Sequence, residues 1–334
     1  MLRRRFLRGA AASGALYLGT SHGLGSVGAA QNARTRIRLG YLGNVCEAAT
    51  YAAPVSQIFH DHGLDARLAP FRSEHALLTA LSSGTIDAAS MLLGSLLRPL
   101  AEGLNVRVVA GLHAGCIRVV SPNPMDLSRL EDLRGKLIAT DRIGGASMNL
   151  LSALLGAQGI DPRRAVAWRA YGLSNLATAL EAKEVACVAA ADPLGYFLLK
   201  SNFAEPYIDT SHRGFTCGED FEHGHHCFLA LHGALVEEHP STAAAVTRAF
   251  LAQSEAIPMH VGPEAFRDAR GAYADGDVTQ TIGMLSSYLW NPSTEYVAEE
   301  IELSARDFQN VGLLSAHTDP HGLATQTFAN VLHV

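Results

Sequence analysis

Cysteine and histidine side chains, whose sulfur and nitrogen atoms bind transition metals, occur in two close pairings in this chain. His113 stands three residues before Cys116. Much later in the sequence, His226 directly precedes Cys227. Copper, zinc, nickel and iron all accept such soft and borderline ligands. These four residues are the predicted metal ligands. Cys46, which follows the first apolar run of the sequence, is a further thiol that we expect close to them.

The same residues have two other interpretations. The stretch H-x-H-H-C that ends at Cys227 lacks the paired spacing of a zinc finger, so a polar loop beside small buried thiols fits it as well. A disulfide between Cys217 and Cys227, closing a loop of about ten residues, is the third interpretation. The chain has 5 Cys. Because that number is odd, at least one thiol stays unpaired, metal-bound or reactive in an oxidising compartment.

The Cys and His residues must be positioned by the strands and helices around them. In this chain, apolar runs of strand length alternate with amphipathic helical patterns. The predicted strands are 36–42, 65–70, 86–90, 106–112, 117–121, 136–140, 166–171, 185–191 and 227–231. The predicted helices between them are 50–62, 73–83, 95–102, 146–158 and 174–182. Such alternation predicts parallel sheets with helical crossovers. Residues 201–226 are expected to be irregular, and the later helices are expected at 240–256, 263–272, 277–287, 293–302 and 304–312.

A strand, a small-residue turn and a helix start follow one another between Leu130 and Gly159. The turn reads Gly-Gly-Ala-Ser over 144–147, and apolar residues then recur at helical spacing. The start of a helix has free backbone N–H groups and the positive end of the helix dipole, so it favours a polar or anionic ligand. The chain contains no Ser-His-Asp signature, P-loop, H-E-x-x-H or dinucleotide-binding glycine pattern. We therefore expect ligand capture and no enzymatic activity.

The N-terminus is typical of an exported protein. Residues 3–8 read RRRFLR, which resembles the twin-arginine signal, and a moderately apolar segment leads to a small-residue cleavage site at 28–30. A membrane anchor is the alternative, but the segment is rich in Gly and Ser. Residues 1–30 hold four Arg and no acid, so their removal changes the formal net charge from −6 to −10. That charge argues against nucleic acid and anionic membranes as partners, and the signal predicts a periplasmic location.

Several segments together resemble the nitrate/sulfonate/taurine-type substrate-binding proteins of ABC transporters, a group that includes thiamine-pyrimidine-synthase-like proteins. They are GTIDAAS (84–90), VRVVAGLHAGCIRVVSP (106–122), LEDLRGKLIAT (130–140), ALEAKEVACVAAADP (179–193) and EEHPSTAAAVTRAF (237–250). The resemblance implies an α/β, two-lobed periplasmic-binding-protein type II fold, in which parallel-sheet lobes are joined by two crossing strands. Its expected divisions are a signal peptide at 1–30, lobe I at 31–116 and 228–334, and lobe II at 117–227.

The fold that the resemblance implies places a ligand outside the carboxyl ends of the strands. The candidate ligand-binding residues there are Asn44, Cys46, Arg72, Ser90, Met91, His113, Cys116, Gly145, Ser147, Tyr171, Asp192 and Cys227. The expected ligand is a small molecule or an oxyanion, for which Arg72, Arg118 and Arg142 are candidate cations. The expected protein is a monomer that docks on an ABC permease, with no cofactor unless the Cys/His residues hold a transition metal.

The sequence is compatible with two alternatives. One is a metal-binding carrier or sensor that uses the Cys/His cluster. The other is a pyrimidine-synthase-like enzyme, whose relatives have a cofactor-binding Lys after an early strand. Here the corresponding segment, Ser90 to Ser95, reads SMLLGS and has no Lys, which weighs against the enzyme.

Overall fold

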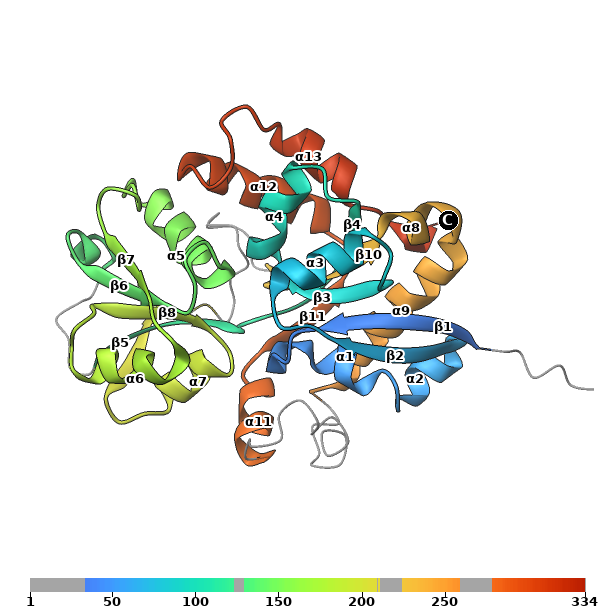
Figure 1. Cartoon of the computed structure of the whole chain (residues 1–334), viewed down its shortest axis with the longest axis horizontal. Coiled ribbons are helices and arrows are strands. Elements are labelled where there is room, and N and C mark those ends of the chain that lie inside the picture. The colour runs from blue at the N-terminus through green and yellow to red at the C-terminus, as the bar shows by residue number, and fades with distance from the viewer. Residues whose placement is uncertain (1–33, 123–128, 209, 211–223, 259–277, 334) are drawn as a thin grey trace, which may run out of the picture. The chain divides into compact units, whose positions relative to one another are not determined.

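Two β-sheets with helices packed on them make up the part of the chain that the computed structural model describes (Figure 1). The described residues are 34–122, 129–208, 210, 224–258 and 278–333. The predicted signal peptide, the expected helix at 263–272 and Cys217 lie outside these ranges. No helix among the described residues combines the length and apolar character needed to cross a membrane.

The first sheet has six strands in the order β11-β4-β10-β3-β1-β2. Their bounds are β1 (Thr35–Tyr41), β2 (Leu64–Pro70), β3 (Ala88–Leu92), β4 (Val106–Ala114), β10 (Cys227–His232) and β11 (Leu289–Ser293). Strand β1 is parallel to β2 and β3, whereas β10 is antiparallel to both β3 and β4. The predicted parallel pairing is present at β1, and β10, one of the strands that follow a crossing between the sheets, runs antiparallel to its neighbours. The sheet is mixed because β10 enters it from the opposite end, after the chain has completed the second sheet.

The second sheet has five strands in the order β7-β6-β8-β5-β9. Their bounds are β5 (Ile117–Pro122), β6 (Leu137–Thr140), β7 (Ala167–Ala170), β8 (Cys187–Ala191) and β9 (Ala204–Ile208). Strand β6 is parallel to β7 and β8, and β5 is antiparallel to β8 and β9. The chain passes between the sheets twice, from β4 to β5 and again into β10.

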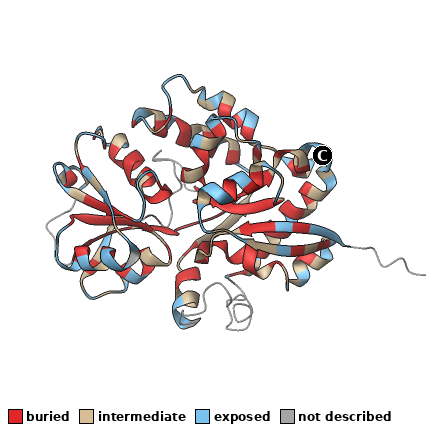
Figure 2. Cartoon of the chain, viewed as in Figure 1, coloured by how far each residue is buried: buried red, intermediate tan, exposed pale blue. Residues whose placement is uncertain are grey.

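Helices cover the sheets, and the inner strands β3, β4, β8 and β10 are buried along nearly their whole length (Figure 2). The helices are α1 (Ala48–Ala52), α2 (Gln57–Asp61), α3 (Glu74–Ser82), α4 (Leu93–Ala101), α5 (Ala146–Ala157), α6 (Leu173–Glu181), α7 (Leu194–Leu199), α8 (Gly233–Glu238), α9 (Pro240–Ala256), α11 (Val278–Leu285), α12 (Val297–Asn310) and α13 (Pro320–Thr327). Short 3-10 turns are η1 (Val45–Glu47), η2 (Leu130–Leu133) and η4 (Val331–His333). Strand β3 is buried along its whole length, as a central strand covered on both faces should be.

Several predicted elements have other bounds in the structure. The expected helix at 50–62 is two short helices, because Ser56 caps a new helix start by accepting a hydrogen bond from the Ile58 N–H. The region expected to be irregular contains β9. The two helices expected at 293–302 and 304–312 are the single helix α12. The residues just before them form β11, whose pairing with β4 outweighs the helical pattern of the sequence.

Candidate functional site

A cavity of about 320 Å³ lies where strand ends and helix starts of the two sheets meet. Its lining residues are Leu42, Asn44, Arg72, Ser73, Glu74, Leu92, Asp141, Arg142, Ala146, Ser147 and Ala191. Leu92 is the last residue of β3 and Ala191 the last of β8, so each sheet contributes a strand end to the lining. This placement outside strand carboxyl ends is where open α/β sheets bind ligands.

One part of the lining is the start of α3. Ser73 is the N-cap residue, and its hydroxyl accepts a hydrogen bond from the Ala76 N–H at 3.2 Å. Arg72 immediately precedes this cap, and among the described residues it has no ion-pair partner. A helix start and a guanidinium group thus face the same space, and both favour an anion.

A second helix start, that of α5, faces the same cavity through Ala146 and Ser147. Gly145 is the N-cap residue in an extended conformation, and it has no side chain to satisfy the first N–H groups. Ser147 is 2% exposed. The first N–H groups of α5 therefore have no side-chain cap, and the helix starts where the Gly-Gly-Ala-Ser sequence predicts it.

Acidic groups balance part of this positive charge. Glu74 forms an ion pair with Arg142, with 2.5 Å between the Glu74 Oε2 and Arg142 Nη2 atoms. Burial raises the pKa of Asp141 above its ordinary value, and the neighbouring Arg142 opposes that rise. The cavity thus presents donors and cations together with two carboxyl groups, which suits a small oxyanion or a compact molecule with charges of both signs.

The loop that brings Asn44 to the cavity is held by one buried carboxyl group, that of Glu47, whose pKa burial raises to about 8. Glu47 accepts backbone hydrogen bonds from Leu42, Gly43 and Asn44, at 2.9, 2.9 and 2.7 Å respectively. These bonds fold the chain after β1 into η1, whose middle residue is Cys46. Glu47 therefore sets the positions of both a cavity residue and a buried thiol.

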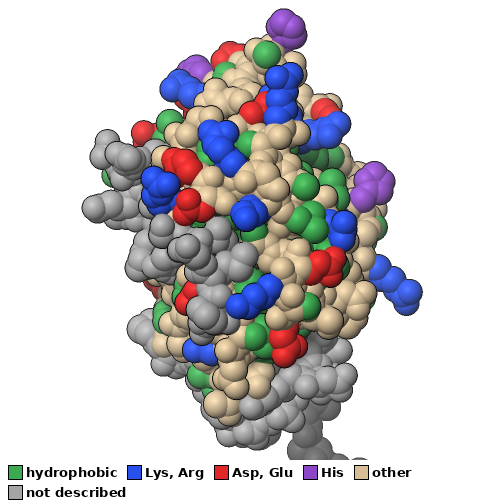
Figure 3. All heavy atoms as spheres, turned by 90° about the vertical axis from the view of Figure 1, so that its left-hand side faces the viewer, with side chains coloured by type: hydrophobic (Ala, Val, Ile, Leu, Met, Phe, Trp, Pro, Cys, Tyr) green, Lys and Arg blue, Asp and Glu red, His purple; other side chains and the backbone are tan. Residues whose placement is uncertain are grey.

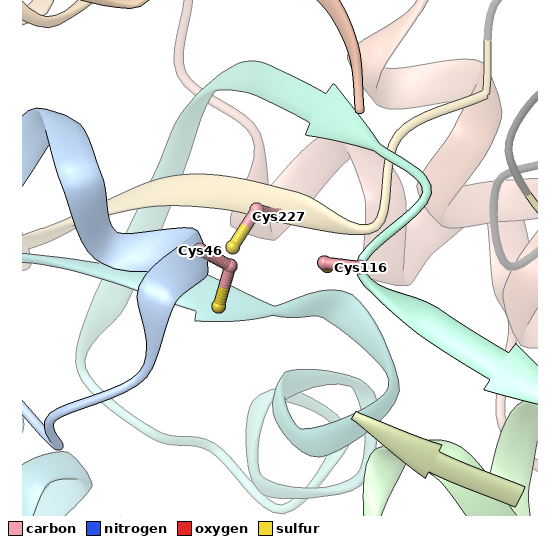
Figure 4. A group of neighbouring side chains, drawn as sticks. All are labelled: Cys46, Cys116 and Cys227. Atoms are coloured by element: carbon pink, nitrogen blue, oxygen red, sulfur yellow. The ribbon is translucent and has the colours of Figure 1, made fainter. Parts of the chain in front are cut away.

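Three thiols meet away from the cavity lining. The Sγ atoms of Cys46, Cys116 and Cys227 all lie within 4.8 Å of one another, and each residue is buried. Figure 4 shows that they come from three separate segments: η1, the β4–β5 connection and the start of β10. We call this group the thiol cluster. Cys227 is a free thiol, and its alternative partner Cys217 lies outside the described residues.

The thiols of the cluster do not titrate alike. Burial alone raises the pKa of the Cys116 thiol, but hydrogen bonds from the Cys227 and Cys46 thiols outweigh it and lower that pKa to about 6. The same hydrogen bonds to Cys116 raise the pKa of Cys46 and of Cys227 well above the ordinary value. Cys116 is therefore the thiol that holds a negative charge most readily, with the two others as S–H donors.

The two histidines predicted as metal ligands lie beside the cluster in different ways. The Nε2–H of His113 donates to the Cys46 carbonyl at 2.9 Å, and its ring stacks on Tyr288 with centroids 5.0 Å apart. Burial lowers the pKa of His113, so the ring is neutral and its Nε2 is occupied. His226 approaches more closely, with 3.9 Å between its Nδ1 and the Cys116 Sγ.

Other predicted site residues lie outside the lining. Ser90 is buried in β3 with its hydroxyl 3.0 Å from that of Thr50, and Met91 is part of the apolar core. Tyr171 donates to Glu184 at 2.8 Å. Their strand-end positions are the reason for the prediction, but their side chains point into packing contacts elsewhere.

Asp192 forms a buried ion pair with Arg118 beside the first crossing. Three hydrogen bonds of 2.9 to 3.1 Å join the Arg118 guanidinium to the carboxylate, and the Tyr196 N–H adds another at 2.8 Å. Burial raises the pKa of Asp192 to about 6 although Arg118 opposes it. This geometry holds β5 to α7 and leaves Asp192 outside the cavity lining.

Three of the predicted ligand-binding residues, Asn44, Arg72 and Ser147, line the cavity. Sequence reasoning missed the acids Glu74 and Asp141. Their signal is positional, since Glu74 follows the N-cap of a predicted helix and Asp141 follows a predicted strand. Acids at such positions are usually solvated, so the sequence alone does not distinguish them.

Comparison with solved structures identifies the architecture as the periplasmic-binding-protein fold. The aliphatic sulphonate binding protein SsuA of Escherichia coli matches with a TM-score of 0.68 at 16% identity, over 86% of this chain and 91% of that one. The nitrate-binding protein NrtA of Synechocystis PCC 6803 matches with a TM-score of 0.69 at 13% identity, over 90% and 87%. A zinc-bound ligand binding component of an ABC-type import system from Staphylococcus aureus matches at 0.64 and 17% identity, over 89% and 100%.

The sequence itself then assigns the family. The model of the NMT1-like family matches residues 30–261, which is well over half of the chain, and the protein belongs to that family. No curated protein matches the chain significantly. The fold that the resemblance to nitrate- and sulfonate-type binding proteins implies is confirmed, because proteins of both names share it.

Proposed function

We propose that this protein is the periplasmic solute-binding component of an ABC importer, and that it captures a small ligand with an oxyanionic group. The observation that carries the proposal is the cavity between the starts of α3 and α5, with Arg72 beside it. Structural neighbours named for sulphonate and nitrate binding support the same ligand class. Capture and release need no chemical step, so the proposed role is non-enzymatic and requires no cofactor.

The proposed mechanism is closure of two lobes over the ligand. The proposed lobe I comprises 31–116 and 228–334, and the proposed lobe II comprises 117–227. Each then contains one of the two sheets except for Cys227, the first residue of β10 in the first sheet. Hinge closure is the usual response of such two-lobed binding proteins, and the closed form is the one we expect a permease to recognise. The Glu74–Arg142 ion pair spans the proposed lobes and favours the closed form.

Charge supports a small-molecule partner over nucleic acid. On the face shown in Figure 3, basic and acidic side chains are interspersed, and the whole chain has a net charge of −6. A continuous basic surface, which nucleic-acid binding needs, is not visible on that face. We propose a monomer whose only macromolecular partner in transport is the membrane permease.

Calorimetric titration with a panel of oxyanions tests the ligand assignment. The panel contains alkanesulfonates, taurine, nitrate and bicarbonate, and the compared variants are Arg72→Gln and the exposed control Arg134→Gln. We expect at least one compound to bind, Arg72→Gln to weaken it by about tenfold or more through loss of a charge-assisted hydrogen bond, and the control to leave it unchanged. Equal binding by the two variants, or no binding across the panel, contradicts the assignment.

Export is tested separately by cell fractionation. Replacing Arg3 and Arg4 by Lys should retain the protein in the cytoplasm if the twin-arginine signal directs export. The matched control is Arg34→Lys, which lies outside the predicted signal and leaves the arginine pair intact. Periplasmic accumulation of the double variant would show that another route is used.

A further inference from the structure

The thiol cluster is a second place in this chain where chemistry-bearing groups converge. None of its three residues lines the cavity, so the proposed ligand capture does not use it. Cys116 is 0% exposed, Cys227 1% and Cys46 4%. The three Sγ atoms lie within 4.8 Å of one another, so they can contact one ion together.

The donor atoms narrow the chemistry that the cluster can perform. Among the described residues, no carboxylate oxygen or histidine nitrogen lies within 4.8 Å of all three sulfur atoms. His226 Nδ1 lies 3.9 Å from the Cys116 Sγ, and the His113 Nε2–H donates to the Cys46 carbonyl. A structural zinc ion takes four ligands in a tetrahedron, whereas all-sulfur sites select soft ions such as Cu(I). A group made of three sulfur donors suits an ion that accepts three-coordination.

Backbone pairing and hydrogen bonds fix the three segments that contain the thiols. Cys116 lies between the end of β4 and the start of β5, and its carbonyl accepts a hydrogen bond from the Asp192 N–H at 2.9 Å. Cys227 is the first residue of β10 and is paired in register with both His113 and Leu92. Glu47 fixes the turn that contains Cys46. The donors are therefore positioned in advance, as a metal site requires.

We propose that Cys46, Cys116 and Cys227 form a binding site for a thiophilic ion that takes three sulfur ligands. Cu(I) and trivalent arsenic share this chemistry. A cuprous ion displaces the proton from each thiol that it ligates. Arsenous acid forms three As–S bonds while its three hydroxyl groups leave as water with the thiol protons, and no electrons are transferred in either case. The arsenic adduct is uncharged, which suits the buried position.

Anaerobic titration with two probes tests the proposal: Cu(I) in competition with a chromophoric chelator, and arsenous acid. The variants are Cys46→Ala, Cys116→Ala and Cys227→Ala, with the buried thiol of Cys187, in β8 and outside the cluster, replaced in the control Cys187→Ala. We expect the wild-type protein to bind one equivalent of at least one probe. The affinity for that probe should fall about tenfold or more in each cluster variant but not in the control, since even indirect disturbance of a metal site lowers affinity by that much.

X-ray absorption spectroscopy of the loaded wild-type protein gives a readout that does not depend on variants that fold poorly. The expected first shell consists of three sulfur atoms for whichever probe binds, and the bound probe distinguishes the cuprous from the arsenic source. The proposal is overturned if neither probe binds, if the shell contains nitrogen or oxygen, or if Zn(II) binds more tightly with four ligands. The oxyanion titration tests Arg72 in the cavity, and the present titration tests the three cysteines with other probes. Failure of one proposal therefore leaves the other intact.

Discussion

Glu74 and Arg142 form a 2.5 Å ion pair between the first turn of α3 and the connection that precedes α5. The two segments belong to different sheets, and both line the cavity. The pair therefore links the two helix starts that a bound oxyanion would also link. Its partners are 46% and 20% exposed for Arg142 and Glu74 respectively, so it is accessible enough to break when the cavity opens.

Breaking this pair should change opening more than stability. Because exposed ion pairs contribute about 0–1 kcal/mol, Arg142→Gln should change the free energy of unfolding by no more than about 1 kcal/mol. The ligand-free variant should nevertheless have a larger radius of gyration in X-ray scattering than the wild type. Arg98→Gln, which removes an exposed pair within α4, is the control. If both variants scatter alike, the pair does not hold the cavity closed.

The start of α5 should contribute directly to ligand affinity. Proline is tolerated as the first residue of a helix, and the extended Gly145 before it suits a following proline. Ala146→Pro therefore keeps α5 and removes one N–H from the cavity. We expect the proline variant to bind any oxyanion found in the panel at least about tenfold more weakly than the wild type does, since hydrogen bonds to charged groups contribute about 1.5–3 kcal/mol. Ala146→Gly, which retains the N–H, should bind far better than the proline variant in the same titration.

A buried His–Glu pair should make stability fall as pH rises. His225 Nδ1 lies 2.6 Å from Glu300 Oε1. Burial lowers the pKa of His225, but the charge and hydrogen bond of Glu300 outweigh it, and the net pKa is raised above 6.5. Burial raises the pKa of Glu300 as well. The folded state therefore binds more protons than the unfolded state, and the contribution of His225 is complete below pH 6.5 and is lost as pH rises through its folded pKa.

Denaturant unfolding at several pH values measures this effect. The double variant His225→Gln, Glu300→Gln should show a shallower decline of unfolding free energy above pH 6.5 than the wild type does. His225→Gln alone should be about 3–5 kcal/mol less stable, because it leaves a buried carboxyl without its partner. An exposed-site control, His239→Gln, should retain the wild-type slope. An unchanged slope in the double variant would assign the pH dependence to other groups.

The Arg118–Asp192 pair should show the cost of a buried carboxylate. Arg118→Met removes the cation that opposes the effect of burial, so the pKa of Asp192, already about 6, should rise further. An acid whose folded pKa is raised destabilises the fold as pH rises from its unfolded value near 3.8 through its folded value. The loss of stability in Arg118→Met should therefore be greater at pH 8 than at pH 5, by thermal or denaturant unfolding. Adding Asp192→Asn should remove that difference.

Much of the fold could be predicted because runs of apolar residues in the sequence indicate buried strands. The strands that correspond to β1, β2, β4 and β6 lie within a few residues of their predicted positions. The direction of β10 could not be predicted, because a strand of the same apolar pattern fits a sheet in either orientation. Strand β11 was missed for a similar reason, since only its pairing with β4 separates it from the helical pattern around it.

The candidate site was predictable to the extent that it depends on chain position. Asn44, Arg72 and Ser147 were expected near a cleft because they follow strands or begin helices, and all three line the cavity. The convergence of Cys46 with Cys116 and Cys227 depends on distances between segments far apart in the sequence. Whether His113 bonds a metal or the Cys46 carbonyl depends on ring orientation, which packing against Tyr288 sets and which residue spacing does not encode.

The position of β10 has a consequence for the order in which the protein is made. This strand fills the gap between β3 and β4, yet it is synthesised only after β5 to β9. The strands of the second sheet are consecutive in the sequence, so this sheet can assemble first during translation. Until β10 is made, β3 and β4 each have an unpaired edge, which favours aggregation. The first half of the first sheet is thus the segment most in need of a chaperone until Cys227 to His232 emerges from the ribosome.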